Sequence, residues 1–332
     1  MKLLGNLDCE ARWAGAALPA AVQRRISLYA ALFAACAPDD AGDGRGGAAR
    51  HEIWVPAPID PARLLGHPGW TPPIVRTAAP GVAPGVELDL AWADPAAAAA
   101  NDRSRTLAIA GELGVALPGA RVVASLAELD DHLAGFAAGS GDRPWICKAR
   151  WTAAGRDRAR GAGAATGELR ARLARMLARL GPLVFEPWLD RVADLGVCGE
   201  IAAGGEVALL EPHRQVTDPR GGFLGIELAP PLDRAIADEL CAVARAAAGR
   251  LAAQTGYRGR FAIDAFVYRP PGGPGAPRLH PLCELNARHS FGWIARALAR
   301  RLAIRRLGFD APPPGATVLI APAADRVTAW CA

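Results

Sequence analysis

Oxygen-bearing side chains at alternate positions make residues 259–293 the chemical centre of this sequence. Residues 259–269 and 279–289 alternate as half-buried strands do, and the Pro- and Gly-rich run between them predicts the loop of a β-hairpin. Asp264 lies on the first predicted strand, and Glu284 and Asn286 lie two residues apart on the second. This spacing places Glu284 and Asn286 on one face, and antiparallel pairing can bring Asp264 opposite them.

These side chains predict a magnesium site. Two carboxylates and an amide oxygen, with no Cys or His required, suit Mg²⁺, which keeps water and phosphate oxygens as its other ligands. Arg288 continues the alternation and would hold a carboxylate or a phosphate beside the metal. The alternative interpretation is the polar face of an ordinary hairpin. Because the sequence has only two lysines and three asparagines, a chemical role for Lys148 and Asn286 is favoured.

Helices and strands of a mixed protein are predicted to position these residues. The first part reads as a small α/β domain with a partly parallel sheet, and residues 152–167 read as a flexible loop rich in Gly, Ala and Arg. Asn101 or Asp102 can cap one helix, and Ser125 with Glu128 has the spacing of a capping box at another. We expect strands at 2–7, 51–60, 86–92, 117–123, 145–150, 183–189, 195–203, 205–218, 223–228 and 316–324, and helices at 18–37, 101–113, 125–136, 168–180, 232–256 and 294–307.

Composition and charge argue against several classes of protein. The net charge of +5 is spread over 332 residues without a polybasic run, so a nucleic-acid partner has little support. Seven scattered cysteines without a CxxC pair predict buried thiols in a reducing compartment, not a disulfide framework or a zinc site. The first residues do not read as a signal peptide, and the longest apolar block, 26–37, is too short to span a bilayer. We therefore expect a cytoplasmic protein with no membrane partner.

Over residues 95–305 the order of motifs resembles the ATP-grasp superfamily. These motifs are Asn-Asp-Arg at a helix start (101–103), Lys148 on a strand before the Gly-rich loop, Phe-Glu-Pro-Trp at 185–188, and Asp264 followed by Glu-x-Asn-x-Arg at 284–288. The resemblance implies an ATP-grasp fold, α/β and α+β, with an amino-terminal pre-ATP-grasp α/β domain. We expect residues 1–97 to form that domain, 98–189 the lid subdomain, and 190–332 the carboxy-terminal subdomain with the metal site.

The resemblance also implies contacts to ATP. Lys148 looks like the strand lysine that reaches the α-phosphate and the adenine edge, and Gly155 looks like part of the lid loop over the phosphates. Arg103 stands where many members have a lysine, which retains the charge but not the compact ammonium. Asp190 or Asp194 would bind the ribose, and the sequence does not choose between them. The residues that resemble the adenine-binding strand are Glu186, Pro187, Trp188 and Leu189.

For the reaction, the resemblance implies that Asp264, Glu284 and Asn286 bind Mg²⁺. Arg288 would orient the acceptor carboxylate or the transferred phosphoryl group, and Lys148 would join it as a catalytic residue. Arg214, on a strand expected to face the acceptor side, would contact the substrate carboxylate; an ordinary sheet arginine is the alternative.

The activity implied is that of an ATP- and Mg²⁺-dependent ligase, which activates a carboxylate as an acyl phosphate and joins it to an amine. Both partners would be small molecules. Two alternatives stay open: an ATP-grasp small-molecule kinase that stops at phosphate transfer, and a non-catalytic nucleotide-binding partner subunit. The sequence names neither substrate and does not determine the oligomeric state.

Overall fold

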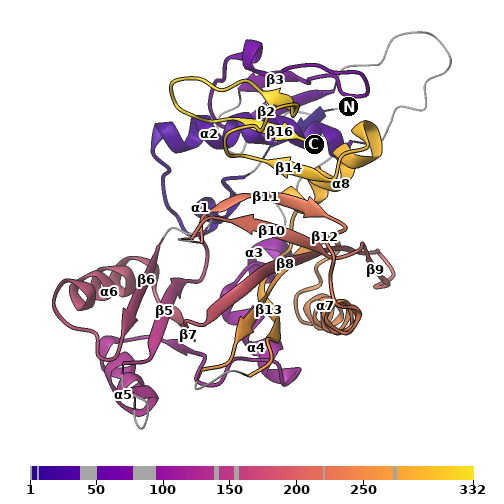
Figure 1. The fold of residues 1–332 in the computed structure, drawn as a ribbon. Coiled ribbons are helices and arrows are strands. Elements are labelled where there is room, and N and C mark those ends of the chain that lie inside the picture. Colours follow the sequence, from indigo (N-terminus) through magenta and orange to yellow (C-terminus); the bar gives the residue numbers. More distant parts are fainter. Residues whose placement is uncertain are drawn as a thin grey trace.

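Three β-sheets organise the computed structural model of this chain, which describes residues 2–5, 7–37, 51–77, 95–137, 142–152, 157–219, 221–271 and 275–332. Figure 1 shows a four-stranded sheet at the lower left, the long strands of a nine-stranded sheet through the centre, and the amino-terminal sheet at the top. Both ends of the chain lie in the upper part of this view (Figure 1).

The amino-terminal sheet is parallel, in the order β1-β2-β3. The expected helix at 18–37 is an α-helix that tightens into a 3-10 helix, and its last six residues are buried. The strand expected at 86–92 lies outside the described residues. The elements are β1 (Lys2–Leu4), α1 (Cys9–Trp13), α2 (Ala20–Ala30), η1 (Ala31–Cys36), β2 (Glu52–Val55), η2 (Pro61–Arg63) and β3 (Ile74–Thr77).

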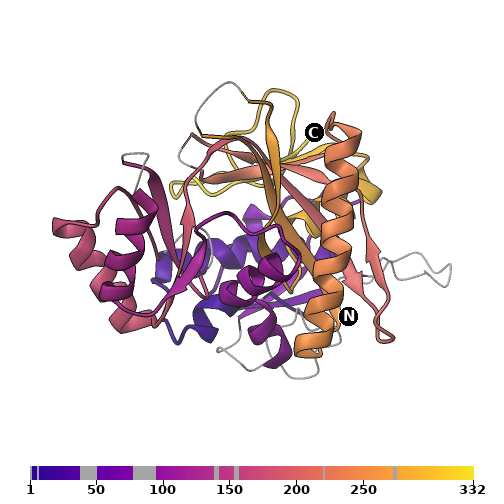
Figure 2. The same cartoon turned by 90° about the horizontal axis from the view of Figure 1, so that it is seen from below.

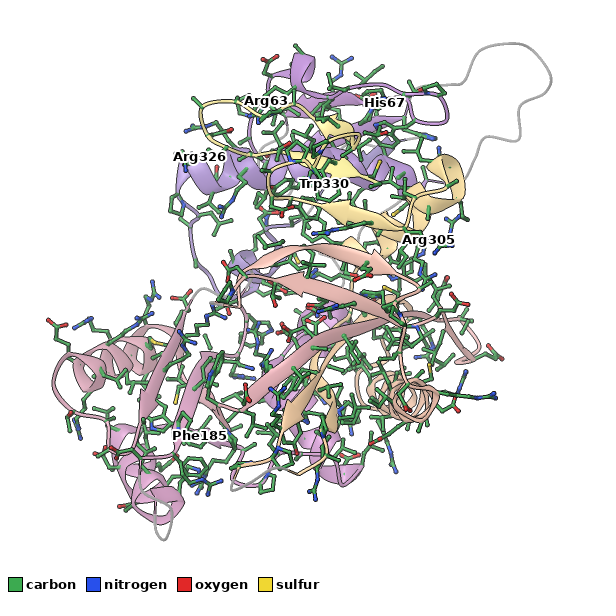
Figure 3. The ribbon with its side chains drawn as sticks, viewed as in Figure 1. Arg63, His67, Phe185, Arg305, Arg326 and Trp330 are labelled. Carbon is green, nitrogen blue, oxygen red and sulfur yellow. The ribbon has the colours of Figure 1, made fainter. Side chains whose placement is uncertain are left out.

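The four-stranded sheet is antiparallel, in the order β4-β7-β5-β6, and two helices cover it around Trp145 and Phe185. Figure 3 labels Phe185 in this part of the molecule. The expectation of a flexible loop over 152–167 is wrong for 158–162, which pair with β5 as a strand because Ala159 is buried and Gly161 leaves room for the Trp145 ring. The elements are β4 (Arg121–Val123), α5 (Leu126–Ala137), β5 (Pro144–Ala149), β6 (Arg158–Ala162), α6 (Gly167–Leu180) and β7 (Leu183–Pro187).

The nine-stranded sheet has the order β13-β12-β8-β10-β11-β14-β16-β15, with β9 paired to β8. Figure 2 shows the long helix α7 lying beside its strands. The expected strand at 205–218 is two strands, since Pro212 between them has no backbone N–H to donate. The strands are β8 (Asp190–Ile201), β9 (Val207–Leu209), β10 (His213–Thr217), β11 (Phe223–Leu228), β12 (Gly259–Arg269), β13 (Arg278–Asn286), β14 (Arg306–Gly308), β15 (Thr317–Ile320) and β16 (Ala329–Cys331).

Helices pack on both faces of this sheet. One face, which includes Phe261 and Ile263, packs against α7 (Arg234–Thr255), α3 (Pro95–Ala100) and α4 (Arg103–Glu112). The residue between them, Ala262, belongs to the opposite core, as does α8 (Phe291–Leu302). Alternate strand residues point to opposite faces, so Asp264 lies on the face turned away from α7.

The last helix ends earlier than expected. The sequence predicts a helix through residue 307, but α8 ends at Leu302, where Ala303 adopts a left-handed conformation with φ of 51°. Leu307 instead pairs with Cys331 in the sheet. Local apolar spacing could not distinguish these outcomes, because the pairing partner is the far end of the chain.

The predicted helix starts are observed. Asp102 caps α4, accepting a hydrogen bond from Ser104 N at 2.9 Å. The Ser125 half of the capping box forms, since Glu128 N donates to Ser125 Oγ at 3.1 Å, but Glu128 Oε2 accepts from the N–H of Ala124, the residue before the cap, at 2.8 Å. These caps depend on neighbours within four residues, so the sequence predicts them well.

Three hydrophobic cores hold the chain together. One joins amino-terminal residues from Leu3 to α8 and to carboxy-terminal residues up to Cys331. The second surrounds α7 and includes residues of α3 and α4, while the third lies within residues 123–185. We keep 1–97, 98–189 and 190–332 as a proposed division of the chain; the first two cores cross its boundaries.

No helix in the described part of the chain combines the length and apolar character that crossing a bilayer requires.

Candidate active site

The predicted hairpin forms as β12 and β13, and its register brings the candidate metal ligands together. Asp264 pairs directly with Glu284, and Asn286 pairs with Ala262. Asn286 Nδ2 donates to Asp264 Oδ2 at 3.2 Å, so the amide and this carboxylate are in contact. The hairpin and the opposition of Asp264 to Glu284 are confirmed.

The environment of Asp264 favours a bound cation. Burial, followed by the negative charge of Glu284, raises the pKa of Asp264 to about 7. The hydrogen bonds from Gln215 and Asn286 act in the opposite direction without cancelling this effect. A divalent cation between the two carboxylates would remove their repulsion.

The donor set fits Mg²⁺. Among the described residues, no group of three or more His, Cys, Asp or Glu side chains is placed to hold a metal, so the site would depend on the amide oxygen as its third ligand. Asn286 Oδ1 already accepts a hydrogen bond from Arg288 Nη2 at 3.1 Å, and an amide oxygen has a second lone pair. Mg²⁺ in phosphate-binding sites commonly uses one or two carboxylates and completes its shell with water and phosphate.

Arg288 is fixed by a residue from the other end of the chain. Its Nη2 and Nε donate to Glu10 Oε1 at 2.6 and 3.2 Å, and Glu10 is buried in α1. Burial alone would lower the pKa of Arg288, but Glu10 and Cys9 raise it above its ordinary value. The guanidinium therefore stays charged and oriented beside Asn286.

Lys148 forms an ion pair on the four-stranded sheet. Its Nζ donates to Glu186 Oε2 at 2.5 Å, and both side chains are largely buried. Although burial lowers the pKa of Lys148, Cys283 and Glu186 raise it above its ordinary value. Burial likewise opposes the ionised form of Glu186, but Lys148 holds the pKa of this carboxyl below its usual range. Cys283 Sγ of β13 lies 3.9 Å from Lys148 Nζ, which brings the lysine to the strand that carries Glu284.

Trp188 and Leu189 link the two large sheets, because β7 ends at Pro187 and β8 begins at Asp190. Trp188 N donates to Pro144 O at 2.9 Å, which ties the link to β5. The guanidinium of Arg160 lies 4.6 Å from the centre of the Trp188 ring, and that of Arg191 lies 5.4 Å away. Both are cation–π contacts that restrain the indole.

Arg103 does not present a free cation at this site. Its Nη2 donates to Glu284 Oε1 at 2.6 Å and to Thr152 O at 2.7 Å, and its Nη1 donates to Thr152 Oγ1 at 3.0 Å. Burial lowers the pKa of Arg103, but Glu284 and Glu10 raise it above its ordinary value. Arg103 therefore links Thr152, after β5, to Glu284 on β13. A phosphate that bound Arg103 would share its guanidinium with Glu284.

One cleft, with a volume of about 1100 Å³, contains these groups. A typical pocket for one small molecule has roughly 300–1,000 Å³, so this cleft has room for a nucleotide and a second ligand. Lys148 borders this cleft from β5 of the four-stranded sheet, Trp188 from the link after β7, and Asp264 from β12 of the nine-stranded sheet. Other predicted site residues that border the same cleft are Arg103, Leu189, Asp194, Arg214, Glu284, Asn286 and Arg288.

The two candidate ribose ligands have different surroundings. Asp194 is half-buried and accepts hydrogen bonds from Arg191 Nη1 at 2.9 Å and from Thr217 Oγ1 at 3.0 Å. Asp190 is more exposed and pairs with Arg269 at 3.3 Å. Both border the cleft, and the fixed orientation of its carboxylate favours Asp194.

Other predicted contacts remain predictions. The guanidinium of Arg214 lies 3.9 Å from Glu227 on the neighbouring strand, which competes with a substrate carboxylate. Gly155 lies outside the described residues. Glu186 and Pro187 do not border the main cleft within the described part of the chain; Glu186 instead faces Lys148.

The structure adds site residues that the sequence did not reveal. Gln215 Nε2 donates to Asp264 Oδ1 at 2.5 Å, and Glu10 holds Arg288. Gln215 follows the predicted residue Arg214 on β10, but neighbouring strand residues point to opposite faces, so the sequence offers no reason to select it. Glu10 carried no signal either, because it lies 278 positions from the arginine that it binds.

Comparisons of sequence found no family model and no curated protein that matches this chain. Solved structures are similar in fold. The N5-carboxyaminoimidazole ribonucleotide synthetase from Thermus thermophilus has a TM-score of 0.55 at 16% identity, with 99% of this chain and 92% of that chain covered. The ADP complex of the purK synthetase of the same name has a TM-score of 0.51 at 11% identity, with 99% and 90% covered. At these identities, the finding is a shared fold.

Proposed function

This chain has the ATP-grasp fold, and from that premise we propose that it is an ATP- and Mg²⁺-dependent ligase that joins a small-molecule carboxylate to an amine. The proposal rests on the placement of Lys148 and the Asp264–Glu284–Asn286 set on two different sheets that border one cleft. ATP in this cleft would lie with its base near Trp188 and Leu189, its ribose at Asp194, and its phosphates between Lys148 and the metal ligands.

We assign each residue of the site a separate role in the reaction. Asp264, Glu284 and Asn286 would hold Mg²⁺, which when bound supplies positive charge to the phosphate oxygens. Arg288, fixed by Glu10, offers its guanidinium to the carboxylate or to the phosphoryl group during transfer. Lys148 would neutralise charge on the phosphate chain, with Glu186 keeping its ammonium in place.

The proposed chemistry has two steps. A carboxylate oxygen of the substrate forms a bond to the γ-phosphorus of ATP, and the bond from that phosphorus to the β,γ-bridging oxygen breaks, giving an acyl phosphate and ADP. The amine nitrogen then attacks the acyl carbon, loses a proton, and displaces inorganic phosphate. The walls of the cleft would exclude water and protect the acyl phosphate from hydrolysis.

Hydroxylamine trapping tests this proposal. The protein is incubated with ATP, Mg²⁺ and a panel of carboxylic acids, and both ADP and hydroxamate are measured. We expect ADP release that depends on the acid, with hydroxamate formed in proportion. Glu284→Gln should reduce turnover at least 100-fold because it removes a charged ligand. Glu200→Gln, at an exposed position on β8, is the matched control and should retain turnover.

The same assay separates the alternatives. A small-molecule kinase would release ADP and form a stable phosphate ester without hydroxamate. A non-catalytic nucleotide-binding subunit would bind ATP, and Glu284→Gln would leave its slow background turnover unchanged. Either result would contradict the ligase proposal.

A reducing compartment, which we propose to be the cytoplasm, agrees with the state of the cysteines. All seven are free thiols, and five of them are buried.

A further inference from the structure

Four aromatic rings line the part of the cleft near α2 and β14, away from the candidate adenine link. Tyr29 of α2 and Phe309 have ring centres 4.9 Å apart, Phe291 and Phe309 are 4.7 Å apart, and Phe223 stacks on Phe291 at 5.4 Å. All four residues border the same cleft as Lys148 and Asp264. We call these four residues the aromatic box.

The aromatic box is assembled from segments distant in sequence. Tyr29 comes from the amino-terminal part, Phe223 from the start of β11, Phe291 from the start of α8, and Phe309 from the residue after β14. In Figure 1 these elements lie in the upper half of the molecule, above β5 and β7. This part of the cleft therefore presents aromatic surface, in contrast to the part near Lys148, where charged side chains predominate.

Packing alone does not account for the exposure of these rings. Tyr29, Phe291 and Phe309 pack with one edge against the amino-terminal core but are only half-buried. Phe223 keeps 37% of its surface exposed, and it is one of four large apolar residues in the described part with this degree of exposure. An open aromatic surface within a cleft is typical of a binding site.

Two arginines add positive charge to the same part of the cleft. Arg25 of α2 and Arg326 both border it, and neither forms an ion pair with a carboxylate of the described residues. The adjacent Asp325 is engaged by Arg63 Nη1 at 2.8 Å. Figure 3 labels Arg63 and Arg326 on the two segments concerned. Cations beside an apolar surface complement an organic anion with a large apolar group.

We propose that the second ligand of the cleft is an organic acid with a large aromatic side chain, and that the aromatic box binds this side chain. The proposal rests on the proposed function, since ATP must fill the charged end of the cleft. Stacked and edge-to-face contacts favour an aryl group over an aliphatic group of similar size. The acid would thus be selected by its side chain, not only by its carboxylate.

Matched acids test the aromatic box. We would compare phenylalanine with alanine, and 3-phenylpropionate with propionate, as activators of ADP release. We expect kcat/KM to be at least tenfold higher for the aryl member of a pair. Phe223→Ala should remove most of this preference, Phe223→Leu should retain part of it, and Val122→Ala, at an equally exposed apolar position outside the cleft, should leave it unchanged.

A binding measurement keeps this test independent of turnover. Thermal shifts with ADP, Mg²⁺ and each acid would show stabilisation by the aryl acid in the wild type and in Val122→Ala, but not in Phe223→Ala. Equal responses to aryl and small acids, or an unchanged aryl preference in Phe223→Ala, would overturn the aromatic box as a binding site. By contrast, loss of ADP binding itself, or ADP release without hydroxamate, would contradict the ligase proposal and not the box.

Discussion

At the scale of single residues, the Lys148–Glu186 pair combines a structural and a binding role. Both side chains are largely buried, so each charge depends on the other for compensation. Asp264 and Glu284 differ, because two carboxylates face each other across the hairpin, and their cationic neighbours, Arg288 for Asp264 and Arg103 for Glu284, do not offset the rise in the pKa of Asp264. The Lys148–Glu186 pair is neutral as a whole, whereas the Asp264–Glu284 pair would be stabilised further by a bound cation.

Substitution separates the two roles of Lys148. Lys148→Met should weaken ATP binding at least tenfold and lower the free energy of unfolding by about 3 kcal/mol, because Glu186 loses its cation. In the double variant Lys148→Met with Glu186→Gln, no unpaired buried charge remains, so the free energy of unfolding should be close to that of the wild type. ATP binding should still be weak. Urea unfolding and ATP titration measure the two effects. Full recovery of ATP binding in the double variant would contradict the phosphate role.

Cys283 offers a chemical probe of the cleft. It lies against Lys148 and Arg191 and borders the cleft, so ATP with Mg²⁺ should slow its labelling by a maleimide at least tenfold. Cys241 on α7 is also partly accessible and is not among the described residues that line the cleft, so its labelling should be unaffected. Mass spectrometry of the labelled peptides measures both rates. Equal protection at the two thiols would indicate a general stabilisation.

At the scale of elements, the four-stranded sheet depends on a glycine that local sequence reads as part of a loop. A Cβ on Gly161 would collide with the Trp145 ring and come within 2.8 Å of Leu169. This close approach lets β6 lie under α6 and complete the wall of the cleft. Gly161 is therefore required for the packing of β6 against Trp145 and is not merely a loop glycine.

A pair of glycine substitutions tests this packing. Gly161→Ala should lower the free energy of unfolding by about 1–3 kcal/mol, because the buried tryptophan must move. Gly249→Ala is the control: it lies in α7, where an added Cβ meets nothing within 4 Å, and it should raise stability by about 1 kcal/mol. Urea unfolding of both variants gives the values. An increase in the free energy of unfolding for Gly161→Ala as well would show that the clash is relieved at little cost.

At the scale of the whole molecule, the amino-terminal segment completes the site and shares a core with the carboxy-terminal strands. Glu10 of α1 holds Arg288, and Tyr29 of α2 borders the cleft, so we expect catalysis and global stability to depend on the same packing. His213 lies within this arrangement, buried in β10 with its ring against Gly196 and Gly292. Its charge state therefore affects the stability of the assembled chain.

His213 makes stability depend on pH. Burial, and then the positive charge of Arg296, lowers the pKa of His213 from 6.5 to about 3. The unfolded chain binds a proton below pH 6.5 that the folded chain does not, so stability is lost as pH falls from 6.5 towards 3. The slope for one such group is at most about 1.4 kcal/mol per pH unit.

Unfolding at several pH values measures this effect. Between pH 7 and 5, the wild type should lose more stability than His213→Asn. Between pH 8 and 7, the difference between the two proteins should be constant, which serves as the internal control. A constant difference down to pH 5 would contradict a neutral, buried imidazole.

The sequence by itself determined the features that depend on near neighbours. Alternation and a spacing of two predicted the hairpin and placed Glu284 and Asn286 on one face, and side-chain oxygens near helix starts predicted the caps at Asp102 and Ser125. These features follow from local backbone geometry. The ATP-grasp fold was also predicted, because its motifs follow one another in order along the chain.

Only the tertiary structure decided which distant groups complete the site. Glu10 meets Arg288 across 278 positions, Arg103 meets Glu284 across 181, and the aromatic box draws on four separate segments. The strand at 158–162 and the early end of α8 likewise depend on pairing partners elsewhere in the chain. Such contacts depend on how sheets and helices pack together. Packing brings together residues that are far apart in the sequence, so local sequence patterns cannot predict these contacts.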